Sequence, residues 1–289
     1  MEKKEKSYKS SFYTFNLNLK SNKRKGGETF RKIILETEYS RKGVQMRANT
    51  IMYFRNVFTS SVDGKDVVYG IISRNINVEG LEWKDRETAE LVDVHIPKGA
   101  VPGLKEVYFA YTPDHHRVVV QAKSNFSPNI IKEFFQIFFN NFLEKEGEHL
   151  DIIIQQDKDS LEVLEKAKKI SKVFIKLTFT NDDFKKESED LMDRLIRESG
   201  FGDLEITGKS SGNSEIDLNG DLVNGSLGLA TENGFAQVSY TDRSGKKQKL
   251  NTLKHPQIFQ IELTNNTSPL VFAIEAIKNL FKFRNEKAD

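Results

Sequence analysis

An Asp-Gly dipeptide at residues 63 and 64 separates two runs of residues that have the composition of β-strands. Asp-Gly supplies the positive φ angles of a two-residue type I′ turn, which joins neighbouring antiparallel strands. The sequence therefore predicts a hairpin made by strands at 47–60 and 66–73. We expect this part of the chain to form an antiparallel, hairpin-rich fold.

The other segments of the N-terminal half agree with such a fold. Residues 12–19 alternate apolar and polar side chains, as a half-buried strand does. Ser127 and Pro128 begin a predicted helix, because serine caps a helix N-terminus and proline suits the first helical position. The expected first domain covers residues 1–147, with further elements at 28–38 (helix), 105–111 and 117–123 (a second hairpin).

From residue 150 onward the pattern changes to an alternation of strands and helices. A βαβαβ segment is predicted, which forms either a parallel or a split-βαβ sheet. Its strands are expected at 151–156, 173–180 and 204–207, and its helices at 160–169 and 183–198. A Gly/Asn-rich stretch follows over 208–234, with Asn233-Gly234 as a further hairpin turn, then strands at 235–241, 247–250 and 258–263 and an amphipathic helix at 267–283. The fold class is therefore α/β in the mixed α+β sense, with a second domain at 148–289.

Several classes of protein are excluded by what the chain lacks. It has no cysteine, so disulfides, thiolate metal sites and a cysteine nucleophile are excluded, and a reducing cytoplasm is favoured. The apolar stretch at 130–143 is too short and too polar to span a bilayer. His115 and His116 diverge on an expected exposed turn with no third ligand at a suitable spacing. We expect a soluble cytoplasmic protein with no metal and no cofactor.

The charge of the chain is strongly segregated. Residues 1–60 carry fourteen Lys and Arg against five Asp and Glu, whereas residues 61–240 have a net charge of −11. A basic block on an otherwise acidic chain suggests a surface that binds the phosphates of a polyanion. The predicted DNA-contacting residues in this block are Lys23, Arg24, Lys25, Arg31, Lys32 and Arg47.

A second basic cluster lies near the C-terminus. Lys247 and Lys249 alternate along a predicted strand, so they share one face of the sheet. A basic hairpin can follow a phosphate backbone, and we include both lysines among the predicted DNA contacts. Charged residues on an edge strand also discourage aggregation between strands, which is the alternative explanation for this cluster.

An enzymatic alternative is a Mg²⁺-dependent nuclease of the PD-(D/E)xK type. Asp114, Gln121 and Lys123 resemble that pattern, but the predicted hairpin separates Asp114 from Lys123 by roughly 20 Å. Glu106, opposite Lys123, could supply the missing carboxylate. A Glu–Gln–Lys cluster on two strands is also an ordinary salt-bridged face.

The order of elements over residues 105–263 resembles that of the RexA-type phage-exclusion proteins that prophages encode. The local likenesses are VYFAYTPDHHRVVVQAKSNFSPNIIKEFF from Val107, KVFIKLTF from Lys172 and RESGFGDLEITGK from Arg197. The resemblance implies a cytoplasmic homodimer that binds double-stranded DNA without sequence preference. It also implies a sensor in antiviral defence by abortive infection, which signals to a separate membrane channel protein. The basic loop at 20–27 has no counterpart in that family.

Three functions thus remain open from the sequence. The first is a non-enzymatic, sequence-nonspecific DNA-binding protein. The second is the nuclease that uses Glu106, Gln121 and Lys123. The third is a protein-interaction module whose basic loop docks on an acidic partner.

Overall fold

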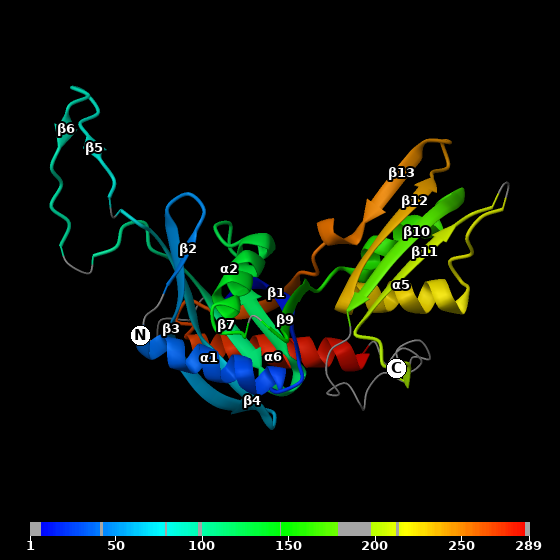
Figure 1. Ribbon diagram of the computed structural model, residues 1–289, viewed down its shortest axis with the longest axis horizontal. Coiled ribbons are helices and arrows are strands. Elements are labelled where there is room, and N and C mark those ends of the chain that lie inside the picture. Colours follow the sequence, from blue (N-terminus) through cyan, green and yellow to red (C-terminus); the bar gives the residue numbers. More distant parts are fainter. Residues whose placement is uncertain are drawn as a thin grey trace.

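The computed structural model describes residues 7–40, 43–78, 80–97, 100–144, 146–178, 198–211 and 214–286 (Figure 1). It confirms the mixed α+β class, with antiparallel sheets and a C-terminal helix. Within the described residues every pair of neighbouring strands is antiparallel. A small two-stranded ribbon of β5 (Trp83–Lys84) and β6 (Leu91–Val92) stands away from the rest of the molecule.

The larger sheet contains eight strands in the order β14-β1-β8-β7-β4-β3-β2, with β9 also paired to β1. Because β1 is long, it pairs with β14 through its first half and with β9 through its second half. The bounds are β1 Ser7–Ser21, β2 Val44–Met46, β3 Thr50–Val62, β4 Lys65–Ile76, β7 Lys105–Thr112, β8 Arg117–Gln121, β9 Glu148–Ile154 and β14 Phe259–Thr264.

Both hairpins predicted from the sequence are present. Asp63 and Gly64 have φ angles of 48° and 76°, and Val62 faces Lys65 across the turn, as a type I′ turn requires. The second hairpin joins β7 to β8 through the short 3₁₀ helix η1 (Pro113–His115). Its turn is not exposed as predicted: His116 is buried, and the His115 ring packs 4.6 Å from that of Phe281. The C-terminal helix covers this turn.

Helices cover both faces of the larger sheet. On one face, α1 (Gly26–Ser40) and α2 (Pro128–Asn140) pack against β1, β3, β7 and β9, and phenylalanines fill this core. On the other face, α6 (Pro269–Glu286) buries Phe272, Ala276 and Leu280 against strand residues such as Phe12 and Val119. The predicted terminal helix therefore has a packing role. None of the helices in the described part of the chain is both long and apolar enough to cross a membrane.

The N-terminus of α2 provides a first test of the fold. The Ser127 hydroxyl accepts a hydrogen bond from the Ile130 amide at 3.4 Å, so serine is the N-cap as predicted. Replacing Ser127 by alanine leaves that amide without its cap, and we expect S127A to lower the free energy of unfolding by about 1 kcal/mol. Urea denaturation measures the change. S127D, which keeps a capping oxygen, should restore most of the lost stability.

The smaller sheet contains four strands in the order β11-β10-β12-β13, and α5 (Asp221–Asn233) lies along one side of it (Figure 1). Buried residues of β10 and β12, including Ile175 and Val238, pack against Leu227 and Ala230 of α5. The strands are β10 Lys169–Thr178, β11 Asp203–Lys209, β12 Gly234–Thr241 and β13 Lys247–Asn251.

The C-terminal half differs from the sequence prediction in several places. Asn233-Gly234 is not a hairpin turn, since Asn233 ends α5 and Gly234 begins β12. The helix predicted at 160–169 is reduced to η2 (Lys158–Leu161) and α3 (Glu162–Glu165). The helix predicted at 183–198 lies, apart from Glu198, outside the described residues.

Elements from both sides of the predicted domain boundary at residue 147 belong to the larger sheet and its core. β9, β14 and α6 come after that point, but all three belong to the larger sheet and its core. The two sheets are joined by neighbouring segments: the amide of Asp157 donates to the carbonyl of His255, and that of Gln257 to the carbonyl of Gln155. The βαβ segment is thus split between two antiparallel sheets. The domain boundary itself stays a prediction.

Candidate nucleic-acid interface

Arg24, a predicted phosphate contact, is part of an internal ion pair. Its Nε donates to Glu148 Oε1 at 2.7 Å and its Nη2 pairs with Oε2 of the same carboxylate. The Glu148 side chain is only 2% exposed, and it also accepts from the Ser21 hydroxyl and the Glu144 amide. The Arg24 hydrogen bond, together with the other donors, lowers the pKa of Glu148 to about 2. Arg24 therefore holds the loop after β1 against the start of β9.

Most other cations of the N-terminal block also face a carboxylate. Lys23 Nζ lies 2.8 Å from Glu144, and this hydrogen bond raises the pKa of the lysine. Arg47 lies 3.1 Å from Glu133. The ion pairs within α1 are longer: Arg31 Nη1 lies 4.0 Å from Glu28 Oε2, and Lys32 Nζ lies 3.7 Å from Glu36 Oε1. Lys25 is exposed and, among the described residues, has no acidic partner. Among the described residues, most of the predicted phosphate contacts in this block are thus paired with a carboxylate.

The predicted residues Lys247 and Lys249 lie in a different setting. Both are exposed on β13, on the face of the smaller sheet that points away from α5, because they alternate with the buried Leu250. We call this surface the outer face. Strands β10, β11, β12 and β13 contribute to it Lys172, Phe174, Lys176, Glu205, Thr207, Lys209, Phe235, Gln237, Ser239, Thr241, Lys247, Lys249 and Asn251.

Three lysines of the outer face form a single row across the sheet. Lys209 on β11 is directly opposite Lys172 on β10. Lys172 is opposite Ser239 on β12, and Ser239 is opposite Lys249 on β13. We call Lys172, Lys209 and Lys249 the lysine row. Neighbouring strands are about 4.8 Å apart, so these ammonium groups can reach successive phosphates of one backbone.

The lysine row contains one pair of like charges that face each other directly. Like charges directly opposite each other on adjacent strands repel, as Lys172 and Lys209 do here. Within the described part of the chain, none of the three has an ion pair, and the nearby Lys176 is already bound to Glu205 at 3.0 Å. This arrangement has the chemistry of an anion-binding surface. The basic part of the outer face ends at the Lys176–Glu205 ion pair, where a carboxylate is present.

Sequence reasoning identified Lys247 and Lys249 but missed Lys172 and Lys209. Lys172 lies just before the strand predicted at 173–180, and Lys209 lies in the Gly/Asn-rich stretch at 208–234, so neither was predicted to be on a strand. The two-residue alternation of Lys172, Phe174 and Lys176 could have shown that they share one face. The row itself depends on strand pairing between residues far apart in the chain.

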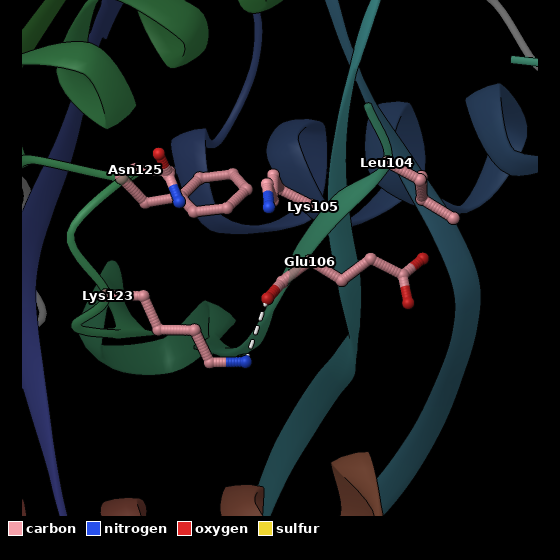
Figure 2. Close-up of a pocket in the computed structure, with 6 residues that line it drawn as sticks. Leu104, Lys105, Glu106, Lys123 and Asn125 are labelled. Atoms are coloured by element: carbon pink, nitrogen blue, oxygen red, sulfur yellow. Dashed lines mark hydrogen bonds between the residues drawn. The ribbon is translucent and has the colours of Figure 1, made fainter. Parts of the chain in front are cut away.

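The residues of the nuclease alternative do not converge on one point. Glu106, Lys123 and Asn125 are among the residues that line a pocket of about 300 Å³, and Figure 2 shows how their side chains lie. Lys123 Nζ donates to the backbone carbonyl of Glu106 at 3.0 Å, while the Glu106 carboxylate points away and pairs with Arg55 at 2.8 Å (Figure 2). Gln121 is buried and donates to Ser10 Oγ at 3.2 Å. Each group is occupied by a different structural contact.

A family model described as a domain of unknown function (DUF4747) matches residues 8–281, from β1 to α6. The chain belongs to the DUF4747 family. No curated protein matches the sequence of this DUF4747 protein. Because the match includes both sheets, the larger sheet and the outer face of the smaller one are parts of the same family unit.

Proposed function

We propose that this DUF4747 protein binds DNA through the sugar-phosphate backbone, without recognising base sequence, and that the outer face is the binding surface. The observation that carries the proposal is the lysine row, in which Lys172, Lys209 and Lys249 share one row across four strands without acidic partners among the described residues. Phosphates would relieve the repulsion within this row, and each neutralised phosphate releases counterions into solution.

The residue types support a sequence-independent mode. Lysine presents a flexible point charge that suits phosphate contacts, whereas the planar groups of arginine, asparagine and glutamine are better suited to bidentate recognition of base edges. The charged residues of the row are all lysines. In the described part of the chain, no helix lies beside this face in a position to enter a groove of DNA. Such a surface contacts phosphates and leaves the sequence unread.

A role in phage defence is a further part of the proposal. It is supported by the resemblance of residues 105–263 to the RexA-type phage-exclusion proteins, as are the homodimer and the separate membrane channel partner. That resemblance favours DNA over RNA as the ligand. The non-enzymatic character of the protein is proposed on the same grounds.

Fluorescence anisotropy of labelled DNA of mixed sequence tests the proposal. We expect binding that weakens steeply between about 50 and 200 mM salt, with a slope that corresponds to at least three phosphate contacts. Oligonucleotides of the same length but different sequence should bind equally well. Absence of binding to any DNA at about 50 mM salt would contradict the proposal.

A triple variant of the N-terminal block serves as a control, because it changes the net charge by the same amount as reversing the three charges of the lysine row. Because Lys23 and Lys32 already face carboxylates, we expect the triple variant K23E/K25E/K32E to retain DNA affinity within about threefold and to keep the salt slope of the wild type. Arg24 is left unchanged, since its loss would disturb Glu148. A large loss of affinity in this variant would move the binding surface to the N-terminal loop.

A further inference from the structure

We infer that the DNA bound by the outer face is single-stranded, and that its bases stack on Phe174 and Phe235. This inference rests on the proposed function and specifies the class of ligand. It is carried by two aromatic rings that lie beside the lysine row, on a face where every other side chain is polar or charged.

The register places the rings and the lysines in consecutive rows. Phe174 is two residues from Lys172 on β10 and is flanked across the sheet by Thr207 and Gln237. Phe235 lies one row further, opposite Lys176. Two residues along a strand span about 6.6 Å, so the first ring lies within the reach of a nucleotide whose phosphate contacts the lysine row.

The two rings form one aromatic platform. Their centroids are 5.8 Å apart with an angle of 51° between the planes, and both side chains are half-buried on the outer face. Among the described residues, neither ring is part of a hydrophobic core cluster: the buried cluster of this sheet lies on its opposite face, with Ile175, Leu177 and Ala236. Two phenylalanines in polar surroundings keep part of their surface in water, which a stacked base would cover.

A single strand is the ligand that can use both features. In a duplex the bases are paired and stacked internally, so only the backbone would reach the face. An unpaired strand exposes the faces of its bases, and proteins bind such strands by combining a basic surface with aromatic side chains on which bases stack. Stacking accepts every base, so this mode also preserves sequence independence. The backbone is expected to follow the lysine row across the strands.

A cross-strand aromatic pair can also serve only to stabilise the sheet, and the test separates that role from stacking. The variant F174L/F235L keeps apolar side chains but removes the rings, and F174Y/F235Y keeps the rings. Binding is measured with labelled oligo(dT) and with a mixed-sequence duplex of the same length. Thermal denaturation followed by circular dichroism shows whether each variant is folded.

We expect the wild type to bind oligo(dT) at least about tenfold more tightly than the duplex, and F174L/F235L to lose at least about tenfold of that affinity. The salt slope of the leucine variant should stay unchanged, because its phosphate contacts are intact. F174Y/F235Y should bind like the wild type. Two results would overturn the inference and leave the proposed function standing. One is that the wild type binds oligo(dT) and the duplex with equal affinity. The other is that a folded F174L/F235L variant binds oligo(dT) as tightly as the wild type does. If the wild type binds neither DNA, the proposed function fails as well.

Discussion

The triple variant K172E/K209E/K249E is expected to lose about 100-fold in affinity for single-stranded DNA at about 0.1 M salt. For a single strand, each neutralised phosphate contributes about 0.7 to the salt slope, so each lost contact removes a factor of about five at that salt concentration. Three lost contacts should also reduce the slope by about two. Anisotropy titrations of the wild type and the variant over a salt series measure both quantities.

This variant should remain folded, which makes its binding defect interpretable. The three side chains are exposed on the outer face, and the wild-type row is itself repulsive. Charge reversal replaces one like-charged row by another, and we expect the midpoint of thermal denaturation to change little. The N-terminal variant K23E/K25E/K32E carries the same change in net charge. If both triple variants lose affinity equally, general electrostatic attraction and not the lysine row would explain the binding.

The variant E148Q is expected to lower the free energy of unfolding at neutral pH by about 3 kcal/mol. Glu148 is nearly inaccessible and receives donors from Ser21, Arg24 and the Glu144 amide, so its carboxylate joins the end of β1 to the start of β9. These donors lower its pKa from 4.5 to about 2. A shift of that size corresponds to the stated free energy, and glutamine would leave Arg24 without its counter-charge.

The same pair predicts a pH dependence with a definite sign. Because the folded-state pKa of Glu148 is depressed, its stabilising effect is fully present above the ordinary value of 4.5 and is lost as the pH falls toward 2. The stability difference between wild type and E148Q, measured by urea denaturation, should therefore be largest near neutral pH and shrink in acid. A control is E144Q: the Glu144 carboxylate is 51% exposed and, among the described residues, its one ion pair is with Lys23. Its effect should stay below about 0.5 kcal/mol. A pH-independent difference for E148Q would contradict this account.

The elements that the sequence predicted well are those fixed by local chemistry. The Asp63-Gly64 turn and the Ser127 cap depend on backbone preferences of a few neighbouring residues, and both are present as expected. By contrast, α5 was missed because Gly225 and Gly228 weaken the helical propensity of its segment. Packing of Leu227 and Ala230 against the smaller sheet compensates for that weakness.

Long-range pairing set the limit of prediction for the rest of the fold. The polar residues Asn16 and Asn18 on β1 suggested a solvent-facing side, but both are completely buried, and Asn16 donates to Asn233 at the end of α5 at 3.0 Å. Nothing in the local pattern shows that a segment more than two hundred residues away covers this strand. The membership of β9 in the larger sheet is of the same kind.

The candidate site was also predictable only where local sequence determines it, and not where distant segments meet. Total charge directed attention to the N-terminal block, but the partners that neutralise it, such as Glu148 for Arg24, are distant in sequence. Alternation alone placed Lys247 and Lys249 on one face, and this geometry is present in β13. The alignment of Lys249 with Lys172 and Lys209 follows from the register of four strands, which only the structure provides.

Photochemical crosslinking of the wild-type protein to oligo(dT), followed by mass spectrometry of the crosslinked peptides, locates the bound strand on the protein. Ultraviolet light joins a thymine to a side chain only where the two are in contact. We expect crosslinks to the β10 and β12 peptides that contain Phe174 and Phe235, and their loss when unlabelled oligo(dT) competes. Crosslinks confined to the loop at residues 20–25, with none on the smaller sheet, would contradict this expectation.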